Sequence, residues 1–489
     1  MKRHGKHIMK IALVISLLIL NSSFGIAGTK KNGEAVVKIK NNANVISVAE
    51  EIDAIVADSI PSKKIYLFKY SKDRSVEEVV SLLNENQNVE LASENSTIGL
   101  PEVFQISQGF PDESVPIFNK GESPKHYYYQ GGTYDIGIDS AHIFSTGAGV
   151  VVAVIDNGLD YSHPLIQQAN ILNGHDFISQ GPDASEEPGS IYGHGTFVAG
   201  MLLLTAPDIS ILPLRVFDGD GIGDQFNVVK AIDWAIRQNV QIINMSFGTD
   251  EMIDILKDAI DDAIDEGIIL VAAAGNDGNS NIAFPSAHPD VIAVASVDTL
   301  ELLADFSNYG EEIDVVAPGV NLYSSLAGEY NWGTWSGTSF STPIVSGTVA
   351  LMLQIDHNLT PLEVQNHIRY TSRTDLLWGS IMAPELQYGY GIINSYKAVT
   401  QLSIADLNGS GVRDVSDLTL MVDYITNRDN NNINSAKYEE RTGFVVTDEL
   451  VDINCDGKAD MSDVSLLVHH IFVNWREFKP CYMSKHSPK

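Results

Sequence analysis

Three residues with the chemistry of a covalent catalyst lie far apart in this chain, each in a glycine-flanked segment. Asp156 ends an apolar run, His194 stands between two glycines, and Ser339 follows a glycine and a threonine. A serine hydroxyl becomes a strong nucleophile when a neighbouring histidine takes its proton. An aspartate beside that histidine can fix its tautomer and stabilise its charged form. The three residue types would therefore support acyl transfer through a covalent intermediate.

Each of these residues has a simpler interpretation when it is considered alone. Ser339 would be an ordinary helix N-cap, His194 a structural histidine and Asp156 the first residue of a turn. Asn276 adds a fourth polar residue in a glycine-flanked segment, between the histidine and the serine. The simpler interpretation would have to hold four times independently, so the joint occurrence favours a functional site.

The segments around these residues alternate between strand and helix patterns. The β-branched run before Asp156 is typical of a strand buried on both faces of a parallel sheet. The alternation predicts an α/β fold, a mainly parallel sheet with helices on both faces. Asp156 and Asn276 then lie at the carboxyl edge of the sheet, where open α/β sheets bind ligands. We expect strands at 150–155, 211–216, 240–245 and 268–274, and helices at 227–237 and 252–265.

The apolar run after Ser339 predicts a buried helix, with the serine at or just before its N-terminus. Free backbone N–H groups and the positive end of the helix dipole are found at such a terminus, which suits a developing oxyanion. The small residue before Ser339 and a proline expected in the first turn, Pro343, fit a tight entry into this helix.

The order Asp, His, Ser along the chain is that of subtilisin and differs from the order in chymotrypsin and the α/β-hydrolases. With its surrounding motifs, the region 130–400 resembles the subtilisin-like serine peptidases, or subtilases. The resemblance implies an endopeptidase that hydrolyses peptide bonds through an acyl-enzyme. It rests on the segments 151–164 (VVAVIDNGLDYSHP), 193–200 (GHGTFVAG), 243–248 (INMSFG), 271–278 (VAAAGNDG) and 337–347 (GTSFSTPIVSG).

The resemblance implies a role for each polar residue. His194 would be the general base, and Asp156 would orient its ring and stabilise the imidazolium. The amide of Asn276 and the backbone N–H of Ser339 would hold the oxyanion of the tetrahedral intermediate. The family also pairs an edge strand with extended substrate, a form of β-augmentation. The residues that match this strand are Ser246, Phe247 and Gly248.

Three departures from the family pattern concern calcium in the catalytic domain. Phe197 stands where many subtilases have a second histidine, and Leu165 where many place an aspartate ligand. The segment 204–207 lacks the Asn-rich loop that those members insert. We therefore expect the family's common tight calcium site to be absent from this domain.

The N-terminal part of the chain carries two further signals. A basic start, an apolar run and small residues form the pattern of a secretory signal peptide. The small α/β unit that follows resembles a subtilase propeptide, which assists folding and inhibits until it is cleaved, here between 94 and 130. Its expected elements are a strand at 65–70, a helix at 75–83 and a strand at 89–92.

The C-terminal part contains two copies of one loop pattern. Oxygen side chains stand at positions 1, 3, 5, 9 and 12 with glycine at 6, the ligand scheme of an EF-hand, in which position 7 offers its carbonyl. An apolar helix follows each loop, and these units resemble a dockerin domain, which binds cohesin modules. Because position 5 of the first loop is Ser410, its site should be the weaker. The expected calcium ligands are Asp406, Asn408, Ser410, Val412, Asp414 and Asp417, then Asp452, Asn454, Asp456, Lys458, Asp460 and Asp463.

Composition limits the classes of partner. The 489 residues carry a formal charge of −32, whereas nucleic-acid-binding proteins are normally basic, so we expect no nucleic-acid partner. The N-terminal apolar run is too short to span a bilayer, so we expect no membrane span. The sequence has no CxxC pair and no HExxH motif, which leaves zinc chemistry without support. Cys455 and Cys481 either stay free or form a disulfide in an oxidising compartment.

Three functions remain open at this point. The first is a secreted endopeptidase made as a zymogen, a monomer that acts on polypeptides and docks through calcium to a cohesin-like partner. The second is a catalytically silent protein that only presents a peptide-binding groove, and the third is a processing protease with one dedicated substrate. The four polar residues favour an enzyme. The expected organisation is a signal peptide at 1–27, a propeptide and linker at 28–125, a subtilisin-like domain at 126–402, a small all-α dockerin-like domain at 403–475 and a tail at 476–489.

Overall fold

The structure is a computed structural model of the chain. The described residues are 29–102, 125–128, 130, 132–133, 136–328, 332–374, 388–402, 415–431, 451 and 458–472. The predicted signal peptide, both cysteines and most of the predicted calcium loops lie outside them. Among the described residues, no helix combines the length and the apolar character needed to cross a bilayer.

A parallel sheet forms the centre of the fold, as the sequence predicts. Its strands follow the order β13-β12-β11-β10-β5-β8-β6, with β7 also beside β8, and each pair is parallel. Apart from the two-residue strands β6 and β7, the strands are almost entirely buried, which explains their mostly apolar sequences. Their bounds are β5 (Val151–Asp156), β6 (Asn170–Ile171), β7 (His175–Asp176), β8 (Ser210–Arg215), β10 (Ile242–Met245), β11 (Ile269–Ala273), β12 (Ile292–Val297) and β13 (Val315–Pro318).

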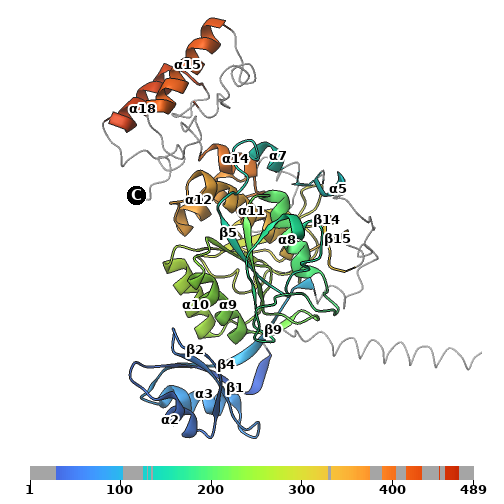
Figure 1. Ribbon diagram of the computed structural model, residues 1–489, viewed down its shortest axis with the longest axis vertical. Helices are drawn as coiled ribbons and strands as arrows, with labels where there is room; N and C mark the ends of the chain where they lie inside the picture. The colour runs from blue at the N-terminus through green and yellow to red at the C-terminus, as the bar shows by residue number, and fades with distance from the viewer. Residues whose placement is uncertain are drawn as a thin grey trace, which may run out of the picture.

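Helices cover both faces of this sheet (Figure 1). Successive side chains of a strand point to opposite faces, so β5 contributes Val152 and Val154 to one core and Ala153 and Ile155 to the other. The first core includes α8 (His194–Thr205), α11 (Thr338–Ile355), α12 (Pro361–Thr371) and α14 (Ser395–Thr400). The second includes α9 (Gln225–Arg237) and α10 (Asp254–Asp265).

The N-terminal unit is a separate sheet with its own core. Its strands pair antiparallel in the order β2-β3-β1-β4. A hydrophobic cluster that includes the buried Phe68, Val37 and Val48 lies between this sheet and two helices. The predicted strand at 65–70 and helix at 75–83 are confirmed, whereas β1 was not predicted and β4 is longer than expected. The elements are β1 (Lys30–Ile39), α2 (Val45–Glu50), β2 (Ile55–Ile60), β3 (Ile65–Lys69), α3 (Val76–Glu85) and β4 (Val89–Gly99).

This unit is joined by strand pairing to the body that contains the parallel sheet. The end of β4 pairs antiparallel with β9 (Ile222–Asp224), a short strand of the body. Strand β4 thus continues from the N-terminal sheet onto the surface of the body (Figure 1).

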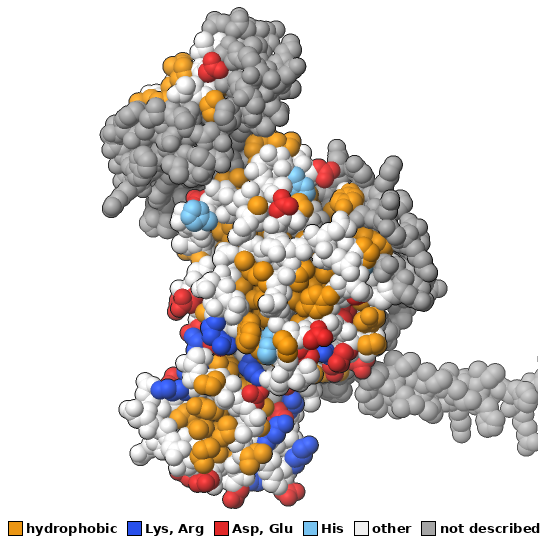
Figure 2. All heavy atoms as spheres, viewed as in Figure 1, with side chains coloured by type: hydrophobic (Ala, Val, Ile, Leu, Met, Phe, Trp, Pro, Cys, Tyr) orange, Lys and Arg blue, Asp and Glu red, His pale blue; other side chains and the backbone are white. Residues whose placement is uncertain are grey.

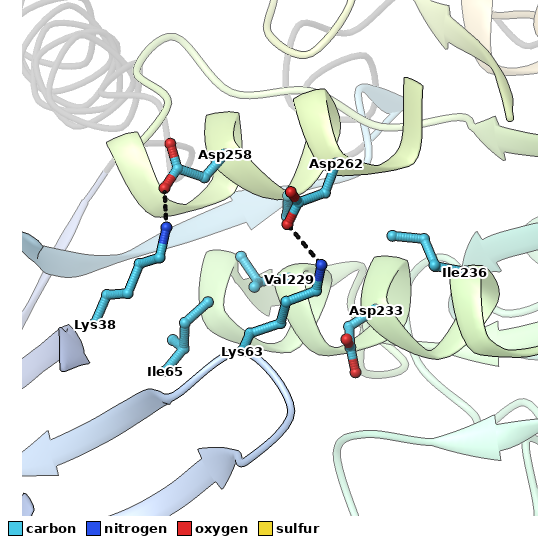
Figure 3. Close-up of a pocket in the computed structure, with 9 residues that line it drawn as sticks. Lys38, Lys63, Ile65, Val229, Asp233, Ile236, Asp258 and Asp262 are labelled. Carbon is cyan, nitrogen blue, oxygen red and sulfur yellow. Dashed lines mark hydrogen bonds and ion pairs between the residues drawn. The ribbon is translucent and has the colours of Figure 1, made fainter. Parts of the chain in front are cut away.

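Ion pairs add to this junction. Lys38 contacts Asp258 at 2.8 Å and Lys63 contacts Asp262 at 2.9 Å, across a pocket floored by α9 and α10 (Figure 3). Basic and acidic side chains also meet along this junction in the space-filling view (Figure 2). The contact is therefore both a sheet extension and a charged surface.

The predicted helices after the two loop motifs are present as α15 (Val415–Asn431) and α18 (Met461–Phe472), and they contact each other. Met421, Ile425 and Leu467 are buried, as expected of the apolar helices that follow the loops. Val422 and Val468 are 37% exposed, so these two apolar side chains are not part of the buried face.

A buried ion pair lies at the carboxyl edge of the sheet and yields a stability prediction. Arg215 and Asp176 meet at 2.8 Å with both side chains only 2% exposed. Asp176 also accepts hydrogen bonds from the Ile178 and Ser179 backbone N–H groups and the Ser179 hydroxyl. The other ionic partner of Arg215 is Glu187, whose side chain is 60% exposed.

Asp176→Leu should therefore destabilise the protein more than Arg215→Leu. The first variant leaves a buried guanidinium without its buried partner, which costs about 3 to 5 kcal/mol of unfolding free energy. The second leaves a carboxylate that still has three donors. Urea unfolding of the full chain in a Ser339→Ala background would measure both. The double variant should be less destabilised than Asp176→Leu alone; the reverse order of the two single variants would contradict this account.

Candidate active site

The structure brings the four predicted polar residues together at the carboxyl edge of the sheet. Asp156 is the last residue of β5, His194 the first of α8, and Ser339 the second of α11. Asn276 follows β11. All four are buried, with Asn276 the most exposed at 8%.

The imidazole of His194 is held by the carboxylate of Asp156. His194 Nδ1 lies 2.8 Å from Asp156 Oδ1. The same oxygen accepts the backbone N–H of Asn157 at 2.8 Å, which fixes the carboxylate. With Nδ1 bound in this way, Nε2 is the nitrogen that faces the rest of the site.

A residue that was not predicted, Glu102, occupies the centre of the site. Its Oε2 lies 3.0 Å from His194 Nε2 and 2.9 Å from Ser339 Oγ. Its Oε1 accepts a hydrogen bond from Asn276 Nδ2 at 3.0 Å. The hydroxyl and the imidazole thus share one carboxylate oxygen of the N-terminal unit. The available signal was only that Glu102 is an acidic residue inside the predicted cleavage window of 94–130, ten residues beyond the predicted strand at 89–92.

Two carboxylates change the proton affinity of the histidine. Burial alone lowers the pKa of His194, but the charges of Asp156 and Glu102 outweigh burial and raise this pKa to about 10. The ring is therefore an imidazolium near neutral pH. A charged imidazole cannot take a proton from Ser339, so the site cannot activate the serine while Glu102 is bound.

The amide of Asn276 is oriented by Thr338. Asn276 Oδ1 accepts the backbone N–H of Thr338 at 3.0 Å and its hydroxyl at 2.8 Å, so Nδ2 must point towards the space beside Ser339. Gly337 keeps this space open. A Cβ at that position would lie 2.1 Å from Glu102 Oε1 and 3.2 Å from Asn276 Nδ2. The space therefore accepts an oxygen atom beside an N–H donor.

The predicted edge strand lies against the chain that enters the site. Gly248 and Gly99 exchange two backbone hydrogen bonds, at 3.1 and 3.5 Å, and the N–H of Leu100 donates to Gly221 at 3.1 Å. The tail of β4 therefore runs as an added strand between two segments of the body. Phe247 lies behind this strand, buried against Phe217 with ring centroids 5.3 Å apart.

Ser246 is bonded to Ser339 in both directions. Ser339 Oγ donates to the Ser246 carbonyl at 3.0 Å, and Ser246 Oγ donates to the Ser339 carbonyl at 2.7 Å. The bond from Ser246 Oγ to the Ser339 carbonyl is possible because Pro343 leaves this carbonyl without a helical donor. Because α11 begins at Thr338, Pro343 lies inside the helix, and the expectation that it lies in the first turn was wrong. Pro343 has no N–H to offer the carbonyl four residues earlier, and Ser246 supplies the donor instead.

The predicted calcium ligands lie mostly outside the described residues. Of their side chains, the structure describes Lys458 and Asp460. Asp460 Oδ1 accepts the backbone N–H and the hydroxyl of Ser462, at 2.8 and 2.7 Å, at the start of α18. In the described part of the chain, no group of three or more His, Cys, Asp or Glu residues could hold a metal ion. The calcium loops therefore remain a prediction.

Comparison with known proteins gives matches over both units. Residues 147–391 match the subtilase family model, and residues 31–95 match that of the fervidolysin N-terminal prodomain. A thermophilic serine proteinase of Bacillus sp. (strain AK1) is 33% identical over 76% of this chain and 88% of its own length. Subtilisin NAT of Bacillus subtilis subsp. natto is 36% identical over 51% of this chain and 65% of its own length.

One solved structure extends the comparison to the fold. Fervidolysin from Fervidobacterium pennivorans, described as a keratinolytic enzyme related to subtilisin, aligns with a TM-score of 0.64. The alignment covers 76% of this chain but only 61% of fervidolysin, and at 22% identity it supports the fold alone. The family match and the 33% identical relative decide the assignment. This chain belongs to the subtilase family, and it is a subtilisin-like serine endopeptidase with a fervidolysin-like N-terminal prodomain.

Proposed function

We propose that Ser339, His194 and Asp156 form the catalytic triad of this endopeptidase, with Asn276 as a donor to the oxyanion. The observation that supports this most is the position of Glu102, whose two oxygens touch the serine hydroxyl, the imidazole and the amide at 2.9 to 3.0 Å. A group that contacts all three marks the place where a substrate carbonyl would lie.

The proposed reaction begins when the Glu102 carboxylate leaves this place. Neutral His194 then takes the proton from Ser339 Oγ as this oxygen attacks the carbonyl carbon of the peptide. Asp156 stabilises the resulting imidazolium, while Asn276 Nδ2 and the backbone N–H of Ser339 stabilise the oxyanion. His194 passes the proton to the leaving amine, which gives the acyl-enzyme. A water molecule, deprotonated by the same histidine, releases the acyl group.

The prodomain is proposed to keep the enzyme inactive until it is cleaved. Its strand β4 fills the groove at Gly248, where we propose that Ser246, Phe247 and Gly248 bind extended substrate. Its Glu102 blocks the nucleophile and also holds the base in its charged form. Both effects end when this segment leaves the groove.

The remaining parts of the chain complete the proposal. A signal peptide at 1–27 would direct a monomeric enzyme out of the cell, where it acts on polypeptide substrates. The domain at 403–475 would bind calcium through its two loops and dock a cohesin-like partner. The other proposed bounds are 28–125 for the propeptide and linker, 126–402 for the peptidase domain and 476–489 for the tail.

The nucleophile can be tested by covalent labelling. A fluorophosphonate should label the processed enzyme, and Ser339→Ala should abolish both labelling and peptide hydrolysis. Ser341→Ala is a matched control, because it removes a buried hydroxyl of the same helix that bonds to Ser296, Ala317 and Pro318 instead. It should still be labelled. Labelling of folded Ser339→Ala at the wild-type rate would refute the assignment.

The block by Glu102 can be tested on the uncleaved chain. Glu102→Gly should let a fluorophosphonate label this chain at least about tenfold faster, because it frees Ser339 and removes one charge that raises the His194 pKa. Glu102→Gln keeps the bulk without the charge, so its rate should lie between that of the wild type and that of Glu102→Gly. The exposed Glu85→Gln is the control for charge on the prodomain. An unchanged rate for Glu102→Gly would contradict the proposed block.

Calcium binding can be tested in the full chain with Ser339→Ala to prevent cleavage. Titration calorimetry should detect two sites of unequal affinity. Asp456→Ala should remove the tighter one, since it deletes the carboxylate at position 5 of the second loop. Ser410→Asp should tighten the weaker one by adding a carboxylate at the equivalent position. Failure of the full chain to bind calcium would refute the loop assignment.

A further inference from the structure

The helix that carries His194 has no capping side chain of its own. Gly193 is the N-cap of α8 with φ of +101°. A Cβ there would lie 2.8 Å from Leu326 Cδ1 and 3.1 Å from the Ala327 nitrogen. Both the backbone angle and the space therefore require glycine, so no serine or aspartate can cap this helix in the usual way.

A distant carboxylate supplies the missing acceptor. Glu186 Oε2 accepts the N–H of Gly193 at 2.5 Å, and Oε1 accepts both the N–H and the hydroxyl of Thr196 at 2.6 Å. The two N–H groups between them bond elsewhere. That of His194 donates to the Ile191 carbonyl at 3.1 Å, and that of Gly195 donates to Asn157 Oδ1 at 2.9 Å. Every N–H of the first turn thus has an acceptor, and Glu186 provides two of them.

The same carboxylate is tied to the segment that follows Asp156. The backbone N–H of Glu186 donates to the Leu159 carbonyl at 3.3 Å, and Leu159 donates to Ala184 at 2.9 Å. The Thr196 hydroxyl, which donates to Glu186, also accepts the N–H of Asp160 at 2.8 Å. Glu186 therefore connects the loop after β5 with the N-terminus of α8.

The charge of Glu186 also bears on the base. His194 is the first residue of α8, where the positive end of the helix dipole opposes formation of an imidazolium. A carboxylate at this terminus offsets that effect. All three partners of Glu186 are donors, so the ionised form fits the site, and a proton on either oxygen would face another donor.

Burial and hydrogen bonding have opposite effects on the pKa of Glu186. Burial raises the pKa of Glu186 to about 7, against the opposing effect of the hydrogen bonds from Thr196 and Gly193. The charge of Asp156 on β5 also raises it. The other titratable groups of the packed segments include Asp160, Tyr161 and His163 in the loop after β5, and Tyr192 and His194 at the start of α8.

We propose that Glu186 is a positioning residue for the general base: its carboxylate closes the N-terminus of α8 and offsets the helix dipole at His194. This role rests on the proposed function of His194, and no part of it requires Glu186 to touch the substrate. It predicts two separable effects, one of geometry and one of charge.

The test compares Glu186→Gln with the wild-type chain after self-processing, using a chromogenic peptide over a range of pH. The glutamine amide keeps one acceptor oxygen but turns an N–H group towards a donor, so at least one of the two helix-terminal bonds is lost. This loss should lower kcat about ten- to a hundredfold with little change in KM, since the base is misplaced while the groove is intact. Removing a negative charge near the imidazole lowers its pKa, so the acid limb of the kcat/KM profile should move to lower pH by about half to one unit.

Matched variants separate these effects from general damage. Glu187→Gln changes a 60% exposed neighbour and should behave as the wild type. Glu186→Asp keeps the charge but is too short to span both N–H groups, so its kcat should fall while the acid limb stays in place. If Glu186→Gln does not fold, Glu186→Asp still decides, because a wild-type kcat in that variant overturns the proposal.

Two further results would be decisive. An acid limb that does not move in folded Glu186→Gln overturns the electrostatic role, and an unchanged kcat overturns the geometric one. A wild-type chain that neither hydrolyses peptides nor reacts with a fluorophosphonate would overturn the proposed function first, and this role with it.

Discussion

The contact of the buried His194 imidazole with two carboxylates is the interaction on which the uncleaved structure depends. Asp156 holds one ring nitrogen and Glu102 the other, with no exposed surface left on the ring. Away from water, such charges are stable only when each is paired and hydrogen-bonded. The pairing accounts for the raised pKa of His194, and it adds to the strand pairing and ion pairs that join prodomain and body. The same arrangement joins the prodomain to the body and, in the proposed mechanism, would keep the imidazole from acting as a base.

The central fold could be predicted from the sequence because its signals are local. Continuous apolar strands alternate with amphipathic helices, and the glycine-flanked polar residues stand at the strand and helix ends where function is expected. The strand β1 was missed because it begins with two lysines, an asparagine, a glycine and a glutamate, which leave only a short apolar stretch. Pro343 was misplaced because the helix begins earlier than the apolar run suggests, with polar residues in its first turn.

Two carboxylates of the site could not be found by the same reasoning. Glu102 lies in a stretch that reads as a linker, and its partners are between 92 and 237 positions further along the chain. Glu186 lies in an acidic loop without periodicity, next to other carboxylates, and nothing in the sequence distinguishes it from them. Only the close approach of distant segments distinguishes these residues. Side-chain contacts of this kind depend on tertiary packing, which a single sequence does not display.

The paired hydrogen bonds between Ser246 and Ser339 have a mechanical consequence. They fasten the segment 246–248 to the first turn of α11, so neither can shift without breaking or stretching a bond of the other. In the reaction proposed above, Ser339 Oγ would give its single proton to His194, so the bond that would persist is that from Ser246 Oγ to the Ser339 carbonyl. This bond ties the backbone at position 339 to the segment that ends at Gly248, and the imino acid at position 343 makes it available by leaving a carbonyl without its helical donor.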